Sequence, residues 1–247
     1  MRIAVAQSRP AAGLVESNLA GHQRLIDIAV QNGAGLVVFP ELSLTGYEPR
    51  MAARVARMPG DACFRLLQTI VDQRGVTIAV GVPTPGHRLP RISTLILRPA
   101  SEIQVYSKQF LHADEEPFFE RGPASDAVIQ PHPCVALAIC YELSVPLHAQ
   151  RAMEAGASIY IASVAKTDQG VEIAGKRLSD IARKHSAVTM MANCLGLLDG
   201  VRCAGGSSVW DRKGRLLTQL DEEQEGIIVL DLVTEEVVTS TLNANPH

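Results

Sequence analysis

Short apolar runs, each about the length of one β-strand, recur along this 247-residue chain and constrain its fold more than any other feature. Most of them are continuously apolar, which is typical of strands in sheets that are covered on both faces. The runs are RIAVAQ, GLVVFPE, VTIAVGVP, STLILRP, IQVYSK, VALAICYE, SIYIASVA, AVTMMANC, SSVWD and GIIVLDL. We therefore expect layers of other elements on both sides of these strands.

Helical patterns lie between several of the runs. The first helix is expected to begin at a Ser17 cap and to end before Gly33, and the second to lie between Asp61 and Gly75. Two further helices are expected in PLHAQRAMEAGA and GVEIAGKRLSDIARKHSA. The stretch VTIAVGVPTPGHRLPRISTLILRPASEIQVYSK instead predicts three strands joined by turns, and DRKG predicts a hairpin turn. Together these patterns predict an α/β fold with a partly antiparallel sheet.

Composition and charge exclude several classes of protein. A net charge of -3 without a Lys/Arg block argues against nucleic acid or an anionic membrane as a partner. The N-terminal apolar stretch is too short for a signal peptide, and no run approaches the ~18 residues of a membrane span. The five cysteines are scattered and form no C-x-x-C pair, so neither a disulfide framework nor a metal site is expected. We expect one cytoplasmic domain, residues 1–247.

Three reactive side chains follow three of the apolar runs. Glu41 follows LVVFP, Lys108 follows IQVYS, and Cys140 follows VALAI. Each alone has an ordinary explanation, as a loop carboxylate, a surface charge or a small buried side chain. Ligands of open α/β sheets, however, bind outside the carboxyl ends of strands, where side chains from several strands converge. We therefore expect the three residues to share one cleft.

These three residue types form a working set for nucleophilic catalysis. A thiolate is a good nucleophile and a neutral thiol is a poor one, so Cys140 needs a base such as Glu41. A lysine cation favours the thiolate and stabilises an oxyanion. The sequence contains no G-x-S-x-G elbow, no P-loop and no H-E-x-x-H. A Cys–His dyad with His112 or His148 stays open at this stage.

The motifs around these residues resemble those of the nitrilase superfamily of carbon–nitrogen hydrolases. VVFPELSLTGYEP is similar to that family's glutamate motif, YSKQFLHADEEPFFERG to its lysine motif, and VALAICYELSVP to its cysteine motif. The three occur in the family's order and roughly its spacing. MMANCLG and GGSSVWDRKGRLLTQLDEEQEGIIVLDL are also similar to family segments, so the likeness covers nearly the whole chain.

The resemblance implies a fold and a set of site residues. It implies a four-layer α-β-β-α sandwich with two mixed sheets, assembled into a homodimer or a higher homo-oligomer, and a site without a cofactor. Glu41 matches the base, Lys108 the lysine and Cys140 the nucleophile. Glu115 matches a second glutamate, although Glu116 lies beside it in the sequence. The resemblance also places Tyr47 in the pocket and the Tyr141 backbone N–H at the oxyanion.

The resemblance implies hydrolysis of a C–N bond in a small amide or N-carbamoyl compound. Tyr141, directly after the nucleophile, is similar to amidase and carbamoylase branches, whereas nitrile-cleaving branches more often have Trp there. The segment SDIARKHSAV lacks the Glu-Asn pair that many members have. Three alternatives stay open: a nitrilase, a silent binding module of the same fold, and a redox-sensing thiol protein in which Cys134 approaches Cys140. Glu142 is expected to make a structural ion pair.

Overall fold

The computed structural model describes residues 1–242, apart from the side chain of Pro131. Within them the larger sheet has the spatial order β15-β14-β1-β2-β3-β4-β5. Strands β1, β2 and β3 are parallel, and the other neighbours pair antiparallel. The bounds are β1 (Arg2–Gln7), β2 (Ala34–Val38), β3 (Thr77–Thr84), β4 (Arg91–Leu97), β5 (Gln104–Ser107), β14 (Gly226–Asp231) and β15 (Val237–Thr241).

The smaller sheet has the order β13-β12-β9-β8-β7-β6, with β7, β8 and β9 parallel. Its strands are β6 (Val128–Pro131), β7 (Cys134–Ile139), β8 (Ile159–Ser163), β9 (Val188–Ala192), β12 (Ser208–Trp210) and β13 (Leu216–Gln219). A separate hairpin consists of β10 (Leu195–Leu198) and β11 (Val201–Ala204). The predicted DRKG turn joins β12 to β13, where the Gly214 N–H donates to the Asp211 carbonyl. That turn prediction is confirmed.

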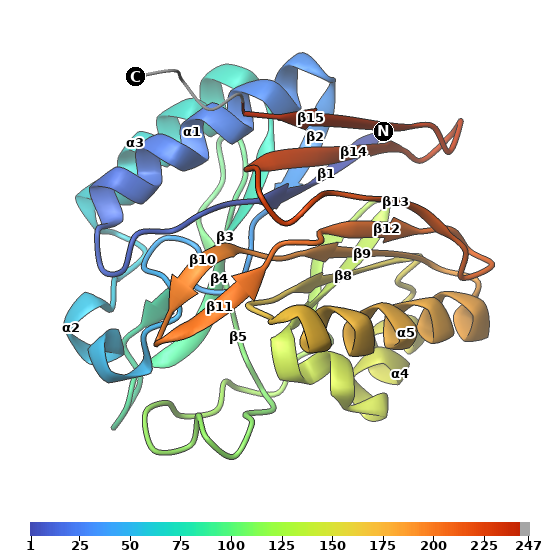
Figure 1. Cartoon of the computed structure of the whole chain (residues 1–247). Helices are drawn as coiled ribbons and strands as arrows, with labels where there is room; N and C mark the ends of the chain where they lie inside the picture. The colour runs from blue at the N-terminus through green and yellow to red at the C-terminus, as the bar shows by residue number, and fades with distance from the viewer. Residues whose placement is uncertain (243–247) are drawn as a thin grey trace.

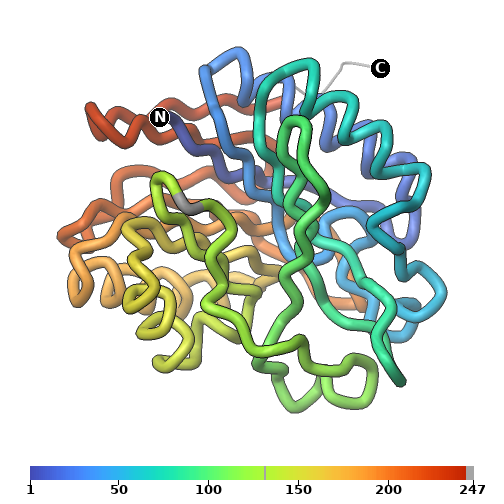
Figure 2. Tube along the Cα trace, turned by 180° about the vertical axis from the view of Figure 1, so that it is seen from behind, coloured from blue at the N-terminus to red at the C-terminus, as the bar shows by residue number. Residues whose placement is uncertain are grey.

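Helices cover the outer face of each sheet, which gives the four-layer α-β-β-α sandwich that the resemblance implied (Figure 1). Helices α1 (Val15–Gln31) and α3 (Ala62–Arg74) pack on the larger sheet, and α4 (Pro146–Glu154) and α5 (Asp168–His185) pack on the smaller one. The short elements are α2 (Ala52–Val55) and the 3₁₀ helices η1 (Pro49–Met51) and η2 (Cys140–Ser144). The green segment between β5 and β6 runs along one edge of the molecule (Figure 2).

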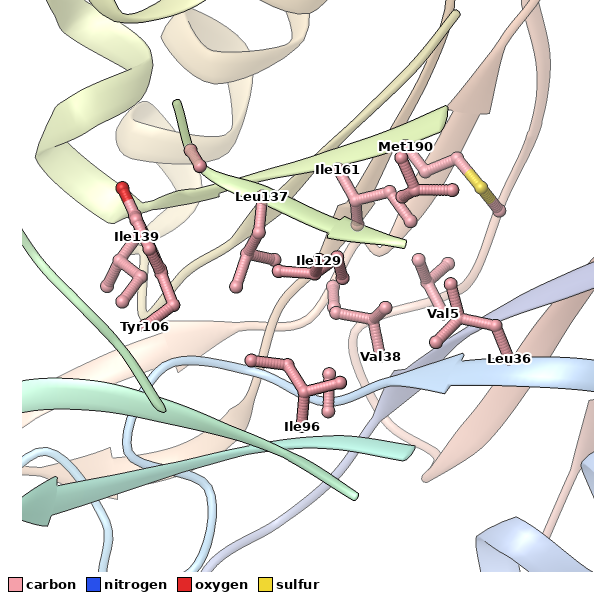
Figure 3. Close-up of a cluster of buried hydrophobic side chains, with 14 of the residues drawn as sticks. Val5, Leu36, Val38, Ile96, Tyr106, Ile129, Leu137, Ile139, Ile161 and Met190 are labelled. Carbon is pink, nitrogen blue, oxygen red and sulfur yellow. The ribbon is translucent and has the colours of Figure 1, made fainter. Parts of the chain in front are cut away.

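Apolar side chains of the two sheets meet between them and form the central core (Figure 3). Val5 and Val38 of the larger sheet face Ile161 of the smaller one, and all three are fully buried. Alternate residues of the same strands point outward, so that Ala4 packs under the outer helices. Burial on both faces explains why the runs are continuously apolar, since neither side of these strands faces water.

The first helix starts earlier than the sequence suggested. Ser17 does not cap it, because the helix begins at Val15 and the Asn18 N–H already donates to the Leu14 carbonyl. The buried side chain of Asn18 instead bonds both the N–H and the carbonyl of Ala11, which fixes the preceding loop. The predicted end of the second helix is confirmed, since α3 ends at Arg74 and is followed by Gly75, which caps it with a left-handed φ of 63°.

Candidate active site

The ends of strands from both sheets bring Glu41, Lys108 and Cys140 together. Lys108 directly follows β5, Cys140 directly follows β7, and Glu41 lies in the loop after β2. The Lys108 Nζ is 2.8 Å from Glu41 Oε1. Glu41 and Cys140 line the same cavity, of about 280 Å³. The cleft that the sequence predicted is therefore present, and the fully buried Lys108 contacts two of the carboxylates that line it, Glu41 and Glu115.

Lys108 is completely buried, and two carboxylates neutralise its charge. Its Nζ donates to Glu41 Oε1 and, at 2.6 Å, to Glu115 Oε1. Burial alone would lower the pKa of Lys108, but the negative charges of Glu41 and Glu115 and the hydrogen bond to Glu115 outweigh it, and the net shift is upward. Lys108 therefore remains an ammonium. Since an ammonium has three donors, one proton is left over after these two hydrogen bonds.

The structure distinguishes Glu115 from its neighbour Glu116. Glu115 is buried, and besides Lys108 it accepts hydrogen bonds from the Tyr47 hydroxyl at 3.0 Å and from the His112 N–H at 2.8 Å. Glu116 is exposed and pairs with Arg121. The second glutamate beside Lys108 is thus Glu115, and Tyr47 reaches the site through it.

Glu41 has one carboxylate oxygen engaged and one free. Its Oε1 accepts from Lys108, whereas its Oε2 is buried and has no hydrogen-bond partner within residues 1–242. Burial raises the pKa of Glu41, and the positive charge of Lys108 opposes this shift. A buried acceptor without a partner is costly. This oxygen belongs to a side chain that lines the same cavity as the Cys140 thiol, and it is chemically able to accept a proton.

Cys140 has an unusual backbone conformation. Its φ is +47°, in the left-handed region that non-glycine residues rarely adopt and that often marks functional sites. Burial raises the pKa of its thiol to about 11, and the negative charge of Glu41 adds to this shift, while Lys166 and Lys108 oppose it. The thiol is therefore protonated at neutral pH and needs a base to react. Tyr141, the next residue, also lines the cavity.

The structure does not support His148 as the partner of Cys140 in a Cys–His dyad. His148 lies outside the cavity and bonds the hydroxyls of Tyr106 and Tyr160. His112 lines the cavity, but its Nδ1 is 2.6 Å from Asp114, and within the described residues no hydrogen bond joins it to Cys140.

The redox alternative with Cys134 does not fit the topology. Cys134 begins β7 and Cys140 follows the end of that strand. Six residues of strand separate their backbones by about 20 Å. Cys134 is therefore out of reach as a resolving thiol.

The ion pair that was expected for Glu142 is present only as a contact of 3.4 Å between its Oε2 and His148 Nε2, which is charged only when this histidine is protonated. Glu142 is buried and accepts hydrogen bonds from the Tyr106 hydroxyl and from the N–H groups of Gln109 and Ile139. Burial raises its pKa to about 7, and burial lowers the pKa of nearby His148 to about 4, so His148 is neutral at pH 7. Gln109 follows Lys108 and Ile139 precedes Cys140, so Glu142 connects the two strand ends that carry them.

Several cavity residues were missed by the sequence reasoning. Lys166 and Thr167 follow β8, and Asp199 and Cys203 belong to the β10–β11 hairpin. Lys166 comes shortly after the apolar run SIYIASVA, so the strand-end rule that found Lys108 would have found it as well. No such signal marked the hairpin, because its position over the cavity depends on tertiary packing.

Comparison with known proteins agrees with this architecture. The carbon-nitrogen hydrolase family model matches residues 2–240. The chain belongs to that family. It is similar to an amidase from Nesterenkonia sp. AN1, with a TM-score of 0.85, 26% identity and coverage of 95% of this chain and 94% of that one. That structure is of one mutant of the amidase and shows the result of Michael addition of acrylamide at the active-site cysteine, and a structure of another mutant shows it in complex with butyramide.

Curated relatives of this carbon–nitrogen hydrolase include both amidases and nitrilases. An (R)-stereoselective amidase from a Pseudomonas species is 26% identical over 80% of this chain and 73% of its own length. A nitrilase from Pyrococcus abyssi is also 26% identical, over 94% of this chain and 90% of its own. Within residues 1–242, no helix is long and apolar enough to cross a membrane, and no group of His, Cys, Asp or Glu is arranged to hold a metal ion.

Proposed function

We propose that this protein hydrolyses a small amide, or an N-carbamoyl compound, to an acid and ammonia through a thioester on Cys140. The observation that carries the proposal is the free Oε2 of Glu41, buried in the same cavity as a thiol that is protonated at neutral pH. A carboxylate oxygen without a partner beside such a thiol is suited to general-base catalysis. No cofactor enters the proposed reaction.

In the proposed mechanism the thiol proton moves to Glu41 as the Cys140 sulfur attacks the amide carbonyl carbon. The resulting oxyanion is stabilised by the remaining Lys108 proton and by the Tyr141 N–H; one such donor is worth about 3 kcal/mol. Glu41 then protonates the leaving nitrogen, the C–N bond breaks, and ammonia departs. Glu41 next takes a proton from water, whose oxygen attacks the thioester carbonyl carbon. The C–S bond breaks, the acid is released, and Glu41 returns its proton to the Cys140 sulfur, which restores the free thiol.

Glu115 has a positioning role in this proposal. It holds Lys108 at 2.6 Å and takes the Tyr47 hydroxyl, so the lysine is fixed from two sides. If Lys108 had only one carboxylate partner, its ammonium could rotate and direct its other protons in several directions. Two carboxylates aim its third proton instead, and geometry of this kind must be held within about 0.5 Å for efficient catalysis.

Nitrile hydrolysis is the second candidate, and the Pyrococcus abyssi nitrilase is the observation that favours it, because it matches nearly the whole chain. The Nesterenkonia amidase structures favour the amide. Ammonia release from matched pairs, such as butyramide and butyronitrile, separates the two. We expect turnover of the amide and its loss in Cys140→Ala; turnover of the nitrile alone, or full turnover by Cys140→Ala, would contradict the proposal.

A silent binding module is the least favoured alternative. Burying Lys108 with two glutamates, and leaving Glu41 Oε2 without a partner, costs stability that a packed apolar core would not cost. A binding role alone does not require this arrangement.

We also propose that the protein is a homodimer, which light scattering coupled to gel filtration would test.

A further inference from the structure

A second lysine, Lys166, lines the cavity wall and differs from Lys108 in its partners. It is half-buried and lies between β8 and the first residue of α5. Its ammonium forms no ion pair and no hydrogen bond within the described part of the chain, whereas two carboxylates neutralise Lys108. The Lys166 ammonium is therefore available to bind a polar group of whatever occupies the cavity.

The backbone of Lys166 is firmly anchored. Its N–H donates to Asn193 Oδ1 at 2.8 Å, and its carbonyl accepts from Asn193 Nδ2 at 3.1 Å and from the Ala204 N–H at 2.9 Å. Asn193 is fully buried and also donates to the Gly205 carbonyl. A buried amide therefore joins Lys166 to the segments after β9 and β11. Sites with such supported positions bind ligands with less ordering cost.

Four carboxylates line the cavity, and within the described residues none of them pairs with the Lys166 ammonium. Two of these, Glu41 and Glu115, are hydrogen-bonded to Lys108 instead. Asp114 and Asp199 also line it, but both are exposed to water, and Asp114 is hydrogen-bonded to His112. Solvent screens such rim charges strongly. The positive charge of Lys166 acts on the site, since it opposes the rise in the pKa of the Cys140 thiol, as the charge of Lys108 also does.

We propose that Lys166 binds a carboxylate carried by the substrate, so that the preferred amide is anionic, such as the half-amide of a dicarboxylic acid. The substrate class rests on the proposed amide hydrolysis, whereas the anion preference of the cavity does not. An ammonium–carboxylate hydrogen bond in a partly enclosed cavity is among the stronger polar contacts. This contact would hold the carboxylate end of the substrate at Lys166, so that the amide group at the other end of the substrate is directed toward Cys140.

Iodoacetate and iodoacetamide test the anion preference without any assumption about turnover. The two reagents have nearly the same shape, differ in charge and alkylate the same sulfur. Alkylation of Cys140 is followed by peptide mass spectrometry, and the iodoacetate-to-iodoacetamide rate ratio is normalised to that of a neutral free thiol. We expect Lys166→Met to lower this ratio by about tenfold, as for loss of one charged hydrogen bond. A change below threefold would overturn the proposal.

Matched variants separate recognition of the carboxylate from a general effect on the thiol. Lys166→Arg keeps the charge and should keep the ratio, and Lys176→Met removes an exposed lysine of α5 and should also keep it. With substrates, Lys166→Met should raise KM for succinamate about tenfold more than it raises KM for butyramide. An equal loss for both substrates, largely in kcat, would instead assign Lys166 to thiol activation and overturn the proposal.

The two failures are distinguishable. If the wild-type protein hydrolyses neither amide but shows the Lys166-dependent alkylation ratio, the proposed function fails and the anion site stands. If it hydrolyses butyramide better than succinamate and the ratio is insensitive to Lys166→Met, amide hydrolysis stands and the anion site fails.

Discussion

Replacing Glu41 by Gln removes the proposed base while keeping the shape of the side chain. The amide can still accept from Lys108, and the Lys108–Glu115 pair at 2.6 Å remains, so the fold and the lysine position should be preserved. What is lost is the acceptor for the thiol proton. Acylation then depends on the thiolate that Cys140 forms by itself in water.

The pKa of Cys140 sets the size of the loss. Because burial raises that pKa to about 11, pH 7 lies about four units below it and only about one thiol in 10⁴ is ionised. Glu41→Gln also removes a negative charge that raises this pKa, so the variant ionises somewhat more readily. We expect acylation at pH 7 to fall between about 10² and 10⁴-fold, within the range of general-base catalysis.

The pH profile gives a sharper test than the rate itself. Stopped-flow alkylation of Cys140 by iodoacetamide should rise about tenfold per pH unit from pH 7 to pH 10 in Glu41→Gln, and should depend much less on pH in the wild type. Glu116→Gln, at an exposed glutamate, is the matched control and should behave as wild type. A Glu41→Gln variant that keeps a tenth of the wild-type rate at pH 7, with the same profile, would refute the assignment of Glu41 as base.

Three further predictions follow from the contacts. Glu115→Gln should lower kcat/KM by about 10²-fold and Glu116→Gln by less than twofold, in an ammonia-release assay; equal effects would remove Glu115 from the site. In Gly81→Ala the new Cβ would clash with the backbone nitrogen of Leu42, in the loop that carries Glu41. Both turnover and the free energy of unfolding should therefore fall, the latter by about 1–3 kcal/mol. Gly60→Ala, with open space around the new Cβ, should change neither. Burial raises the pKa of Glu142 to about 7, so the folded protein retains a proton that the unfolded chain releases above pH 4.5. The contribution of this group to the free energy of unfolding therefore falls as the pH rises from 4.5 to about 7. Urea unfolding at several pH values should show that Glu142→Gln removes this pH dependence.

The sequence predicted the layers because burial acts on each strand separately. Continuous apolar runs indicate strands covered on both faces, and the structure confirms them in both sheets. The start of α1 was missed because Ser17 is a good capping residue, but the buried side chain of Asn18 fixes the preceding loop and lets the helix begin at Val15. Local preference was overridden there by tertiary hydrogen bonds.

The positions of the strand ends and the order of the motifs were enough to predict part of the candidate site. These place Glu41, Lys108 and Cys140 at one edge, but they say nothing about which of two adjacent glutamates is buried or which oxygen is free. They also missed the role of Glu142, since its three hydrogen-bond donors come from β5, the residue after Lys108, and β7. Such contacts depend on how the two sheets pack together.

Mass spectrometry of the protein during turnover tests the central claim most directly. Acid-quenched protein that has been mixed with butyramide or succinamate should carry one acyl group, added as a thioester to the peptide that contains Cys140 and absent in Cys140→Ala. Hydrolysis that continues in Cys140→Ala, or an acyl group attached at any other residue, would contradict the account.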